Sequence, residues 1–100
     1  MLSENEILEI ALKYIEQIEQ TSQIETVLLK DFTIKKTYGN IFFYTSKKYY
    51  ETQDEKYNTL AGGGPFLIEN KSGKIIQFGS RETENYYIKE YEEGRWPIWS

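Results

Sequence analysis

The sequence contains neither cysteine nor histidine in its 100 residues. Without cysteine there are no disulfides and no thiolate metal ligands. Without histidine there is no imidazole base near neutral pH, no Ser-His or Cys-His nucleophile, and none of the commonest zinc ligand. These absences exclude most familiar hydrolase mechanisms. We therefore expect no enzyme activity, no catalytic residues, no metal and no cofactor.

Long apolar runs are also missing. No segment approaches the length of about 20 apolar residues that a membrane-spanning helix needs. The first twenty residues carry Glu4, Glu6, Glu9, Glu16 and Glu19, a composition that does not suit a secretory signal peptide. We expect a cytoplasmic protein that makes no membrane contact.

The charge is only moderately unbalanced, with 16 acidic and 12 basic residues and a net charge of −4. This balance argues against nucleic acid as a partner and favours a basic protein. An apolar content of 39% with 28% charged residues predicts a folded chain. One hundred residues suffice for one hydrophobic core but not for two, so we expect a single domain over residues 1–100.

The chain is organised around residues 60–79, which combine a glycine corner, two apolar runs and a tight turn. The runs at 66–68 and 75–78 are separated by Asn70-Lys71-Ser72-Gly73, a sequence typical of a hairpin turn. Strands joined this closely are antiparallel. Apolar residues stand on adjacent as well as alternating positions, so we expect both faces of this hairpin to be covered. Pro65 has no N–H and should stand at the start of its strand.

The N-terminal segment predicts an amphipathic helix over about residues 4–20. Ser3 and Glu6 have the spacing of a capping box, and apolar residues follow at helical intervals. Thr21, Ser22 and Gln23 are poor helix formers and should end it. The favoured interpretation is a helix laid over a sheet; a groove-binding helix is the alternative.

Two further β segments precede the central hairpin. Residues 24–37 are rich in β-branched residues and predict one strand, bent or bulged near Asp31, where charges interrupt a buried run. Residues 38–40 form a turn, and 41–45 form a strongly apolar strand. Residues 51–58 are polar and predict a surface loop. The fold class expected is α+β, with a four-stranded antiparallel sheet, a long N-terminal helix and a short C-terminal helix.

The short C-terminal helix begins at Ser80 or Thr83 as N-cap and ends at Gly94. Glu92 and Glu93 lie in its last turn, where a negative charge opposes the helix dipole. Trp96 and Trp99 make the end of the chain too apolar for a free tail. Packing back onto the domain is the favoured interpretation, and an exposed aromatic contact is the alternative.

Charge is distributed unevenly along the chain. Residues 4–19 hold five acids and one base, residues 82–93 hold the same numbers, and residues 25–74 hold six acids and eight lysines. If both helices pack on one face of the sheet, the helical layer is acidic. A charged, solvated helix surface is favoured over a recognition surface.

Three patterns allow chemical alternatives. Gly62-Gly63-Gly64 suits an anion-binding nest, but it leads into Pro65 and a strand, so a structural corner is favoured. The acids at positions 51, 54 and 55 suggest glycosidase chemistry or calcium binding, but they lack the calcium-loop spacing, and a solvated loop is favoured. In the pairs Tyr49-Tyr50 and Tyr86-Tyr87, one ring should face inward and its neighbour outward, where tyrosine is a common interface anchor.

The order of these motifs resembles the bacterial immunity protein 35 (YrhB-like) family. The resemblance covers about residues 4–94. It consists of an apolar-aromatic strand at 41–46, the corner and strand at 60–69, the second strand at 72–80, and the tyrosine-rich helix at 86–92. Its most specific part is the spacing of Gly62-x-Gly64-Pro65, the turn glycine and the last helix.

The resemblance implies a small cytoplasmic protein, not an enzyme, that binds and neutralises a secreted polymorphic toxin in the cell that makes it. A chaperone-like protein-binding domain without a dedicated toxin partner is the alternative. The partner expected is a cognate toxin of basic, nuclease-like character, and the chain is expected to be a monomer or a weak homodimer. The candidate partner contacts are aromatic and acidic side chains without an evident local structural role: Tyr49, Tyr50, Glu51, Asp54, Glu55, Glu92 and Glu93.

Overall fold

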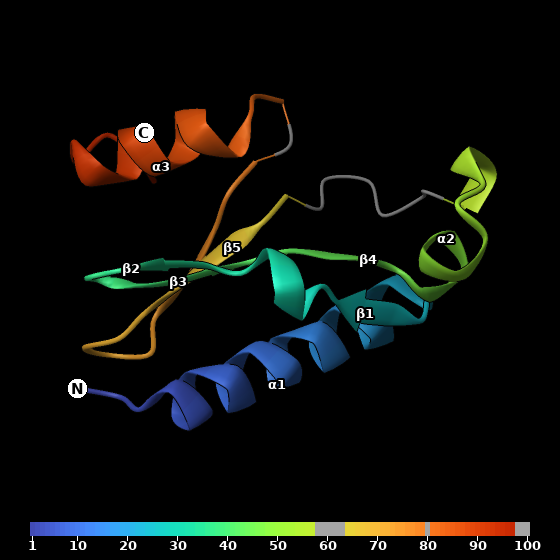
Figure 1. Ribbon diagram of the computed structural model, residues 1–100, viewed down its shortest axis with the longest axis horizontal. Helices are drawn as coiled ribbons and strands as arrows, with labels where there is room; N and C mark the ends of the chain where they lie inside the picture. The colour runs from blue at the N-terminus through green and yellow to red at the C-terminus, as the bar shows by residue number, and fades with distance from the viewer. Residues whose placement is uncertain (58–63, 80, 98–100) are drawn as a thin grey trace.

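The computed structural model describes residues 1–57, 64–79 and 81–97, and it has the α+β class expected (Figure 1). The long N-terminal helix and the short C-terminal helix are both confirmed. Along the chain the helices, strands and 3₁₀ turns are α1 (Glu4–Ser22), β1 (Thr26–Leu28), η1 (Lys30–Phe32), β2 (Ile34–Lys36), β3 (Gly39–Phe42), β4 (Tyr44–Ser46), α2 (Lys47–Thr52), η2 (Glu55–Tyr57), β5 (Phe66–Glu69), β6 (Ile75–Gln77) and α3 (Glu84–Glu92).

The strands form two sheets, so the expectation of a single four-stranded sheet was wrong. β2, β3, β5 and β6 form a four-stranded antiparallel sheet in chain order, and β1 pairs with β4 in a separate two-stranded sheet. The cause lies near Asp31, where an interruption was expected. Between the pairs Leu28–Tyr44 and Ile34–Ile41, one strand advances six residues and the other three. The turn η1 takes up the difference and divides one long hairpin into two sheets.

The central hairpin is confirmed. β5 and β6 are antiparallel, with Leu67 opposite Ile76. Gly73 has φ +77°, and its N–H donates to the Glu69 carbonyl at 2.8 Å, so glycine supplies the left-handed conformation that this turn requires. β5 begins directly after Pro65, as expected. Gly62 and Gly63 lie outside the described residues, which leaves the nest alternative untested.

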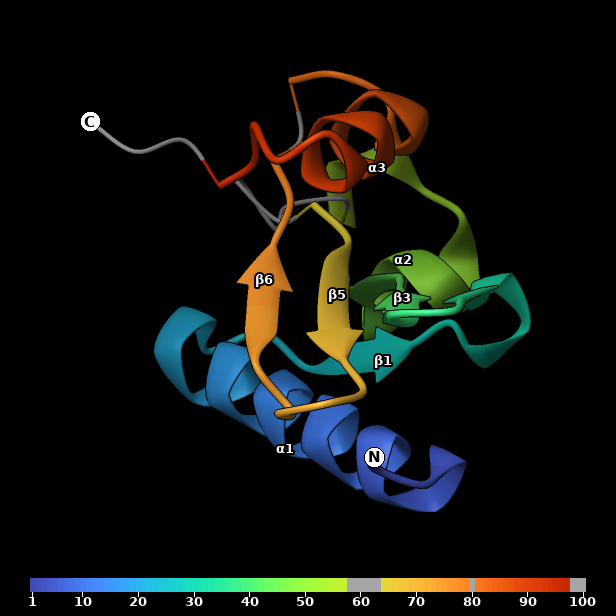
Figure 2. The ribbon, with the colours of Figure 1, turned by 90° about the vertical axis from the view of Figure 1, so that its left-hand side faces the viewer.

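The core has two halves, one on each face of the four-stranded sheet. α1 packs on one face, where Phe42, Phe66 and Ile68 meet the helix. α3 packs on the opposite face, against Ile41 and Leu67. Figure 2 shows β5 and β6 side by side between the two helices. The two acidic helices therefore do not pack on one face of the sheet and do not form a single acidic layer. They lie on opposite faces, because both faces of β5 are apolar and each must be covered.

α1 begins and ends as the sequence predicts. The Ser3 hydroxyl accepts from the Glu6 N–H at 3.1 Å, and the Glu6 carboxylate accepts from the Ser3 N–H at 2.9 Å, which is a complete capping box. The helix ends at Ser22, followed by Gln23 with φ 61°. Its apolar stripe lies over the sheet, with Ala11 fully buried.

The expected surface loop after β4 is largely helical, which is a correction. α2 occupies residues Lys47–Thr52 and η2 residues Glu55–Tyr57. The reason is an N-cap that the sequence analysis missed: the Ser46 hydroxyl accepts from the Tyr49 N–H at 3.1 Å. Residues 51–56 are nevertheless exposed, so their surface position is confirmed.

The C-terminal segment folds back on the domain. Thr83 is the N-cap of α3, Gly94 follows its last turn with φ +79°, and Ser80 lies outside the described residues. The Trp96 indole N–H donates to the Gln77 carbonyl at 3.2 Å, and its ring lies 4.9 Å from that of Tyr87. The packed interpretation is confirmed for Trp96; Trp99 lies outside the described residues.

Among the residues described, no helix combines the length and apolarity needed to cross a bilayer.

Candidate functional site

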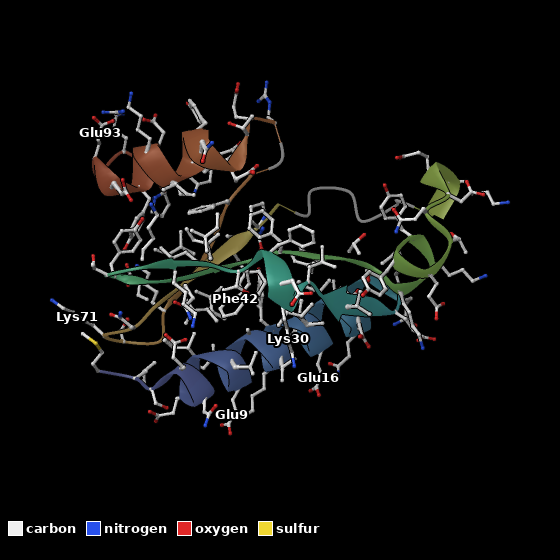
Figure 3. The ribbon with its side chains drawn as sticks, viewed as in Figure 1. Glu9, Glu16, Lys30, Phe42, Lys71 and Glu93 are labelled. Carbon is white, nitrogen blue, oxygen red and sulfur yellow. The ribbon has the colours of Figure 1, made fainter. Side chains whose placement is uncertain are left out.

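The predicted partner contacts lie at two ends of the molecule and do not form one surface. Tyr49, Tyr50, Glu51, Asp54 and Glu55 belong to the segment of α2 and η2. The other two acids, Glu92 and Glu93, lie at the end of α3. In the view of Figures 1 and 3, α2 is on the right and the labelled Glu93 is on the left. The longest extent of the molecule is 36 Å. The predicted contacts therefore form two separate groups.

The tyrosine pairs divide as the sequence predicts. Tyr50 is 56% exposed, and Tyr49 is half-buried. In the second pair, Tyr86 is 46% exposed and Tyr87 only 4%. The inward and outward alternation expected of neighbouring residues is confirmed, and it leaves Tyr50 as a large amphipathic side chain at the surface of α2.

The acids beside α2 have roles within their own segment. The Glu55 carboxylate accepts from the Tyr49 hydroxyl at 3.2 Å, and this bond raises the pKa of Tyr49. The Asp54 carboxylate accepts from the Lys56 N–H at 3.1 Å and lies 3.7 Å from its ammonium. Glu51 lines a hollow of about 420 Å³ together with Ser46 and Lys47. Two of the three acids thus help to order the segment as well as giving it charge.

Phe32 is the surface residue that the sequence analysis missed. It was expected within a strand, but it ends the turn η1 and is 64% exposed. Phe32 and Tyr50 line the same hollow, of about 290 Å³, together with Leu28 and Leu29. We call these four residues the Phe32–Tyr50 surface. The available signal was Lys30-Asp31, because a charged pair in an otherwise apolar run marks where the chain leaves the core.

Glu92 and Glu93 have structural partners, so the premise that no local role accounts for them was wrong. The Glu92 carboxylate accepts from the Tyr38 hydroxyl at 2.6 Å and lies 3.6 Å from the Lys36 ammonium. Glu93 forms an ion pair with Arg95. Burial, followed by the hydrogen bond to Glu92, raises the pKa of Tyr38. These contacts come from residues distant in sequence or beyond the helix end, which helix-dipole reasoning does not include.

Metal binding at the acids of α2 and η2 finds no support. Within residues 1–57, 64–79 and 81–97, no group of three aspartates or glutamates is close enough to hold a metal ion. The carboxylates at positions 54 and 55 are instead occupied by the hydrogen bonds to Lys56 and Tyr49.

The described part of the chain thus defines a small α+β protein with an exposed aromatic surface beside a short helix. It is similar to the uncharacterized protein YrhB of Escherichia coli strain K12, with 35% identity over 54 residues. The match covers 54% of this chain and 56% of YrhB, so the chain spans about half the length of this relative. The relationship is YrhB-like. No family model and no solved structure matches the chain.

Proposed function

We propose that this chain is a cytoplasmic immunity protein that binds a cognate bacterial polymorphic toxin and neutralises it by covering its active surface. The resemblance of its motif order to the immunity protein 35 family supports this proposal, and the similarity to YrhB is consistent with it. The relative has no known activity to transfer, so the argument for binding rests on the surface of this chain.

The observation that carries the proposal is the Phe32–Tyr50 surface. Single exposed aromatic residues are common, but here two large rings, 64% and 56% exposed, line one hollow. Aromatic side chains that enter a partner's pocket supply much of the binding free energy of protein interfaces. Lys30 and Asp31 also line this hollow, so aromatic rings and charged side chains share one concave surface.

Charge has the smaller role at this surface. The exposed acids Glu51, Asp54 and Glu55 lie in a segment that also carries Lys47, Lys48 and Lys56, and Lys30 lines the hollow beside Tyr50. The near balance of charges means that aromatic contact area should determine affinity. The acidic outer faces of α1 and α3 give the molecule its negative charge, which attracts a basic, nuclease-like toxin and mainly accelerates association.

The test is to express this chain with the toxin domain encoded by the neighbouring gene and to measure cell survival and the Kd of the purified pair. We expect Phe32→Ala and Tyr50→Ala each to weaken binding by at least about tenfold, as interface anchors do. The matched control is Tyr86→Ala, because Tyr86 is also exposed but lies on α3. Equal affinities for all three variants would contradict the proposed surface, and absence of binding would contradict the function.

Two further measurements separate the alternatives. Replacing Glu51, Asp54 and Glu55 together with serine should slow association at low salt and flatten its salt dependence; an unchanged rate and slope would remove these acids from the interface. A general chaperone should suppress aggregation of an unrelated heat-unfolded enzyme, whereas a dedicated immunity protein should leave that aggregation unaffected.

A further inference from the structure

A third hollow lies at the end of the molecule opposite α2, where the two hairpin turns meet α3. Its volume is about 410 Å³, and its lining includes Tyr38, Glu69, Asn70 and Tyr91. These residues come from the β2–β3 turn, the end of β5 and the last turn of α3. None of the contacts discussed for toxin binding uses this hollow, so its chemistry is independent of that proposal.

Asn70 carries an unsatisfied acceptor at this hollow. Its backbone N–H donates to the Tyr38 carbonyl at 2.9 Å, and its carbonyl accepts from the Leu2 N–H at 2.7 Å. The side-chain Nδ2 donates to the Thr37 carbonyl at 3.0 Å, which fixes the orientation of the amide. The remaining Oδ1 is buried and has no hydrogen-bond partner among the described residues. A buried acceptor of this kind costs free energy until a donor reaches it.

Glu69 is the second acceptor. It is half-buried, and one carboxylate oxygen accepts from the Tyr91 hydroxyl. The other oxygen has only a long contact of 3.5 Å with the Ser72 hydroxyl. In the described parts of the chain, no lysine or arginine nitrogen lies within 4.0 Å of this carboxylate. A half-buried carboxylate without a counter-ion is a strong acceptor for a cationic donor.

The rings beside these acceptors also suit a cation. The Tyr38 and Tyr91 ring centroids are 5.0 Å apart, with the planes tilted by 46°. Such a pair presents the negative face of an aromatic ring to a cation within about 6 Å. Lys36 does not supply that cation, because it is paired with Glu92. Lys71 and Met1 also line the hollow, but among the described residues neither the Lys71 ammonium nor the N-terminal ammonium lies within 4.0 Å of the Glu69 carboxylate. The Lys71 side chain extends away from the body of the protein (Figure 3).

We propose that this hollow binds an organic cation that carries N–H groups, the ammonium of a lysine-type ligand or the guanidinium of an arginine-type ligand. The cation donates to the Glu69 carboxylate, and the tyrosine rings contact its charge. It donates also to Asn70 Oδ1 when the Asn70 side chain rotates away from the Thr37 carbonyl and exposes that oxygen. A quaternary ammonium offers no N–H and leaves Asn70 unsatisfied. The inference goes beyond toxin binding and does not depend on it.

The test is a titration of the ¹⁵N-labelled chain with N-acetyl-arginine methylamide and N-acetyl-lysine methylamide, followed by two-dimensional NMR. We expect saturable shifts at the Asn70 side-chain amide and at the backbone N–H groups of Asn70 and Lys71. The neutral citrulline analogue and tetramethylammonium should bind about tenfold more weakly, since each lacks either the charge or the N–H donors. Equal shifts with citrulline, or no saturable shift with either cation, would overturn the proposal.

Glu69→Gln is the decisive variant, because it removes the charge and keeps an oxygen for the Tyr91 hydroxyl. We expect it to weaken cation binding by about tenfold. Glu9→Gln is the matched control, since Glu9 is an exposed glutamate on α1, and it should bind as the unmodified chain does. Identical affinities in the two variants would refute the site. If Glu69→Gln fails to fold, the comparison of the arginine and citrulline analogues on the unmodified chain still shows whether the hollow requires a positive charge.

The source of the cation is distinguished by adding a protein partner. If a basic side chain of a toxin occupies the hollow, the toxin displaces the arginine analogue and Glu69→Gln weakens the complex. If the natural ligand is a free amine, the analogue stays bound in the complex and Glu69→Gln leaves toxin affinity unchanged. Failure of toxin binding leaves the result with the free cation intact, so the two proposals fail separately.

Discussion

The two faces of the four-stranded sheet are covered by different chemistry. On the α1 face, aliphatic residues of a 19-residue helix pack on Phe42, Phe66 and Ile68. On the α3 face, a helix of nine residues packs with its tyrosines. Two phenol–carboxylate hydrogen bonds, from Tyr38 to Glu92 and from Tyr91 to Glu69, join α3 to the sheet.

This difference shows how a short helix is held in place. A nine-residue helix has little intrinsic stability, and most of its stability comes from tertiary packing. The α3 face adds two phenol–carboxylate hydrogen bonds to a smaller apolar contact. The α1 face combines a longer apolar contact with hydrogen bonds from Tyr14 to Gln77 and from Asn40 to Glu4. The free energy of the α3 contacts should therefore respond to alkaline pH, at which the phenols of Tyr38 and Tyr91 lose their protons. We expect α3 to open before α1 in partial unfolding.

The largest effect is expected from Phe66→Ala on the α1 face. Phe66 is fully buried, and its ring lies 4.7 Å from Tyr14 and 5.6 Å from Phe42. Removing it leaves a cavity that should cost about 3–5 kcal/mol of unfolding free energy, measured by urea denaturation. The control Phe32→Ala, at an exposed phenylalanine, should change stability by less than about 0.5 kcal/mol. Similar losses in both variants would contradict the assigned core.

A smaller loss is expected from Gly79→Ala on the α3 face. A Cβ at this position would lie 2.5 Å from the Tyr87 hydroxyl. Tyr87 is 4% exposed and packs against Phe78 and Trp96, so the ring has little room to move. We expect a loss of about 1–3 kcal/mol in the same urea assay. The double variant Gly79→Ala/Tyr87→Phe should recover part of it; no recovery would show that the clash lies elsewhere.

On the α1 side, Ser3→Ala should cost about 1 kcal/mol by removing half of the capping box. The measurement is thermal unfolding by circular dichroism. Ser3→Asp keeps an acceptor at the N-cap and should retain most of the stability. A loss as large in Ser3→Asp as in Ser3→Ala would show that the cap is not the cause.

The smallest effect at neutral pH, and the most specific, is expected from Tyr91→Phe. Burial, followed by the hydrogen bond to Glu69, raises the pKa of Tyr91 from 10.0 to about 12. The folded state therefore holds the phenolic proton more tightly. Its contribution is complete below pH 10.0 and is lost as the pH rises toward 12.

Tyr91→Phe removes this contribution, and we expect a loss of about 0.5–1 kcal/mol at neutral pH. The difference between the variant and the unmodified chain should shrink as the pH passes from 10.0 to 12. Urea denaturation at several pH values measures it. A difference that stays constant over this range would show that the stabilisation does not depend on the phenolic proton.

Sequence reasoning succeeded where neighbouring residues decide the structure. The capping box, the glycine of the hairpin turn and the tyrosine alternation depend on residues within four positions of one another. It also expected both faces of the central hairpin to be covered. That expectation implied that some element covers each face of the sheet. Which helix covers which face depends on the course of the loops that connect α1 and α3 to the strands.

The candidate site was predicted only in part for the same reason. Tyr50 follows from the inward and outward alternation of the pair Tyr49-Tyr50, but Phe32 becomes its neighbour only because η1 removes it from the strand. The partners of Glu92 are Tyr38 and Lys36, more than fifty residues away along the chain. No window of sequence contains both sides of these contacts.

The amino-acid sequence by itself determined the N-terminal cap of α1, the central hairpin and the absence of imidazole and thiol groups, since these depend on composition and on short-range interactions. The tertiary structure decided that the sheet is divided, that α1 and α3 lie on opposite faces, and which side chains gather at each end. Those outcomes depend on burial and hydrogen bonds between distant segments, whose free energies are set only when the whole chain packs.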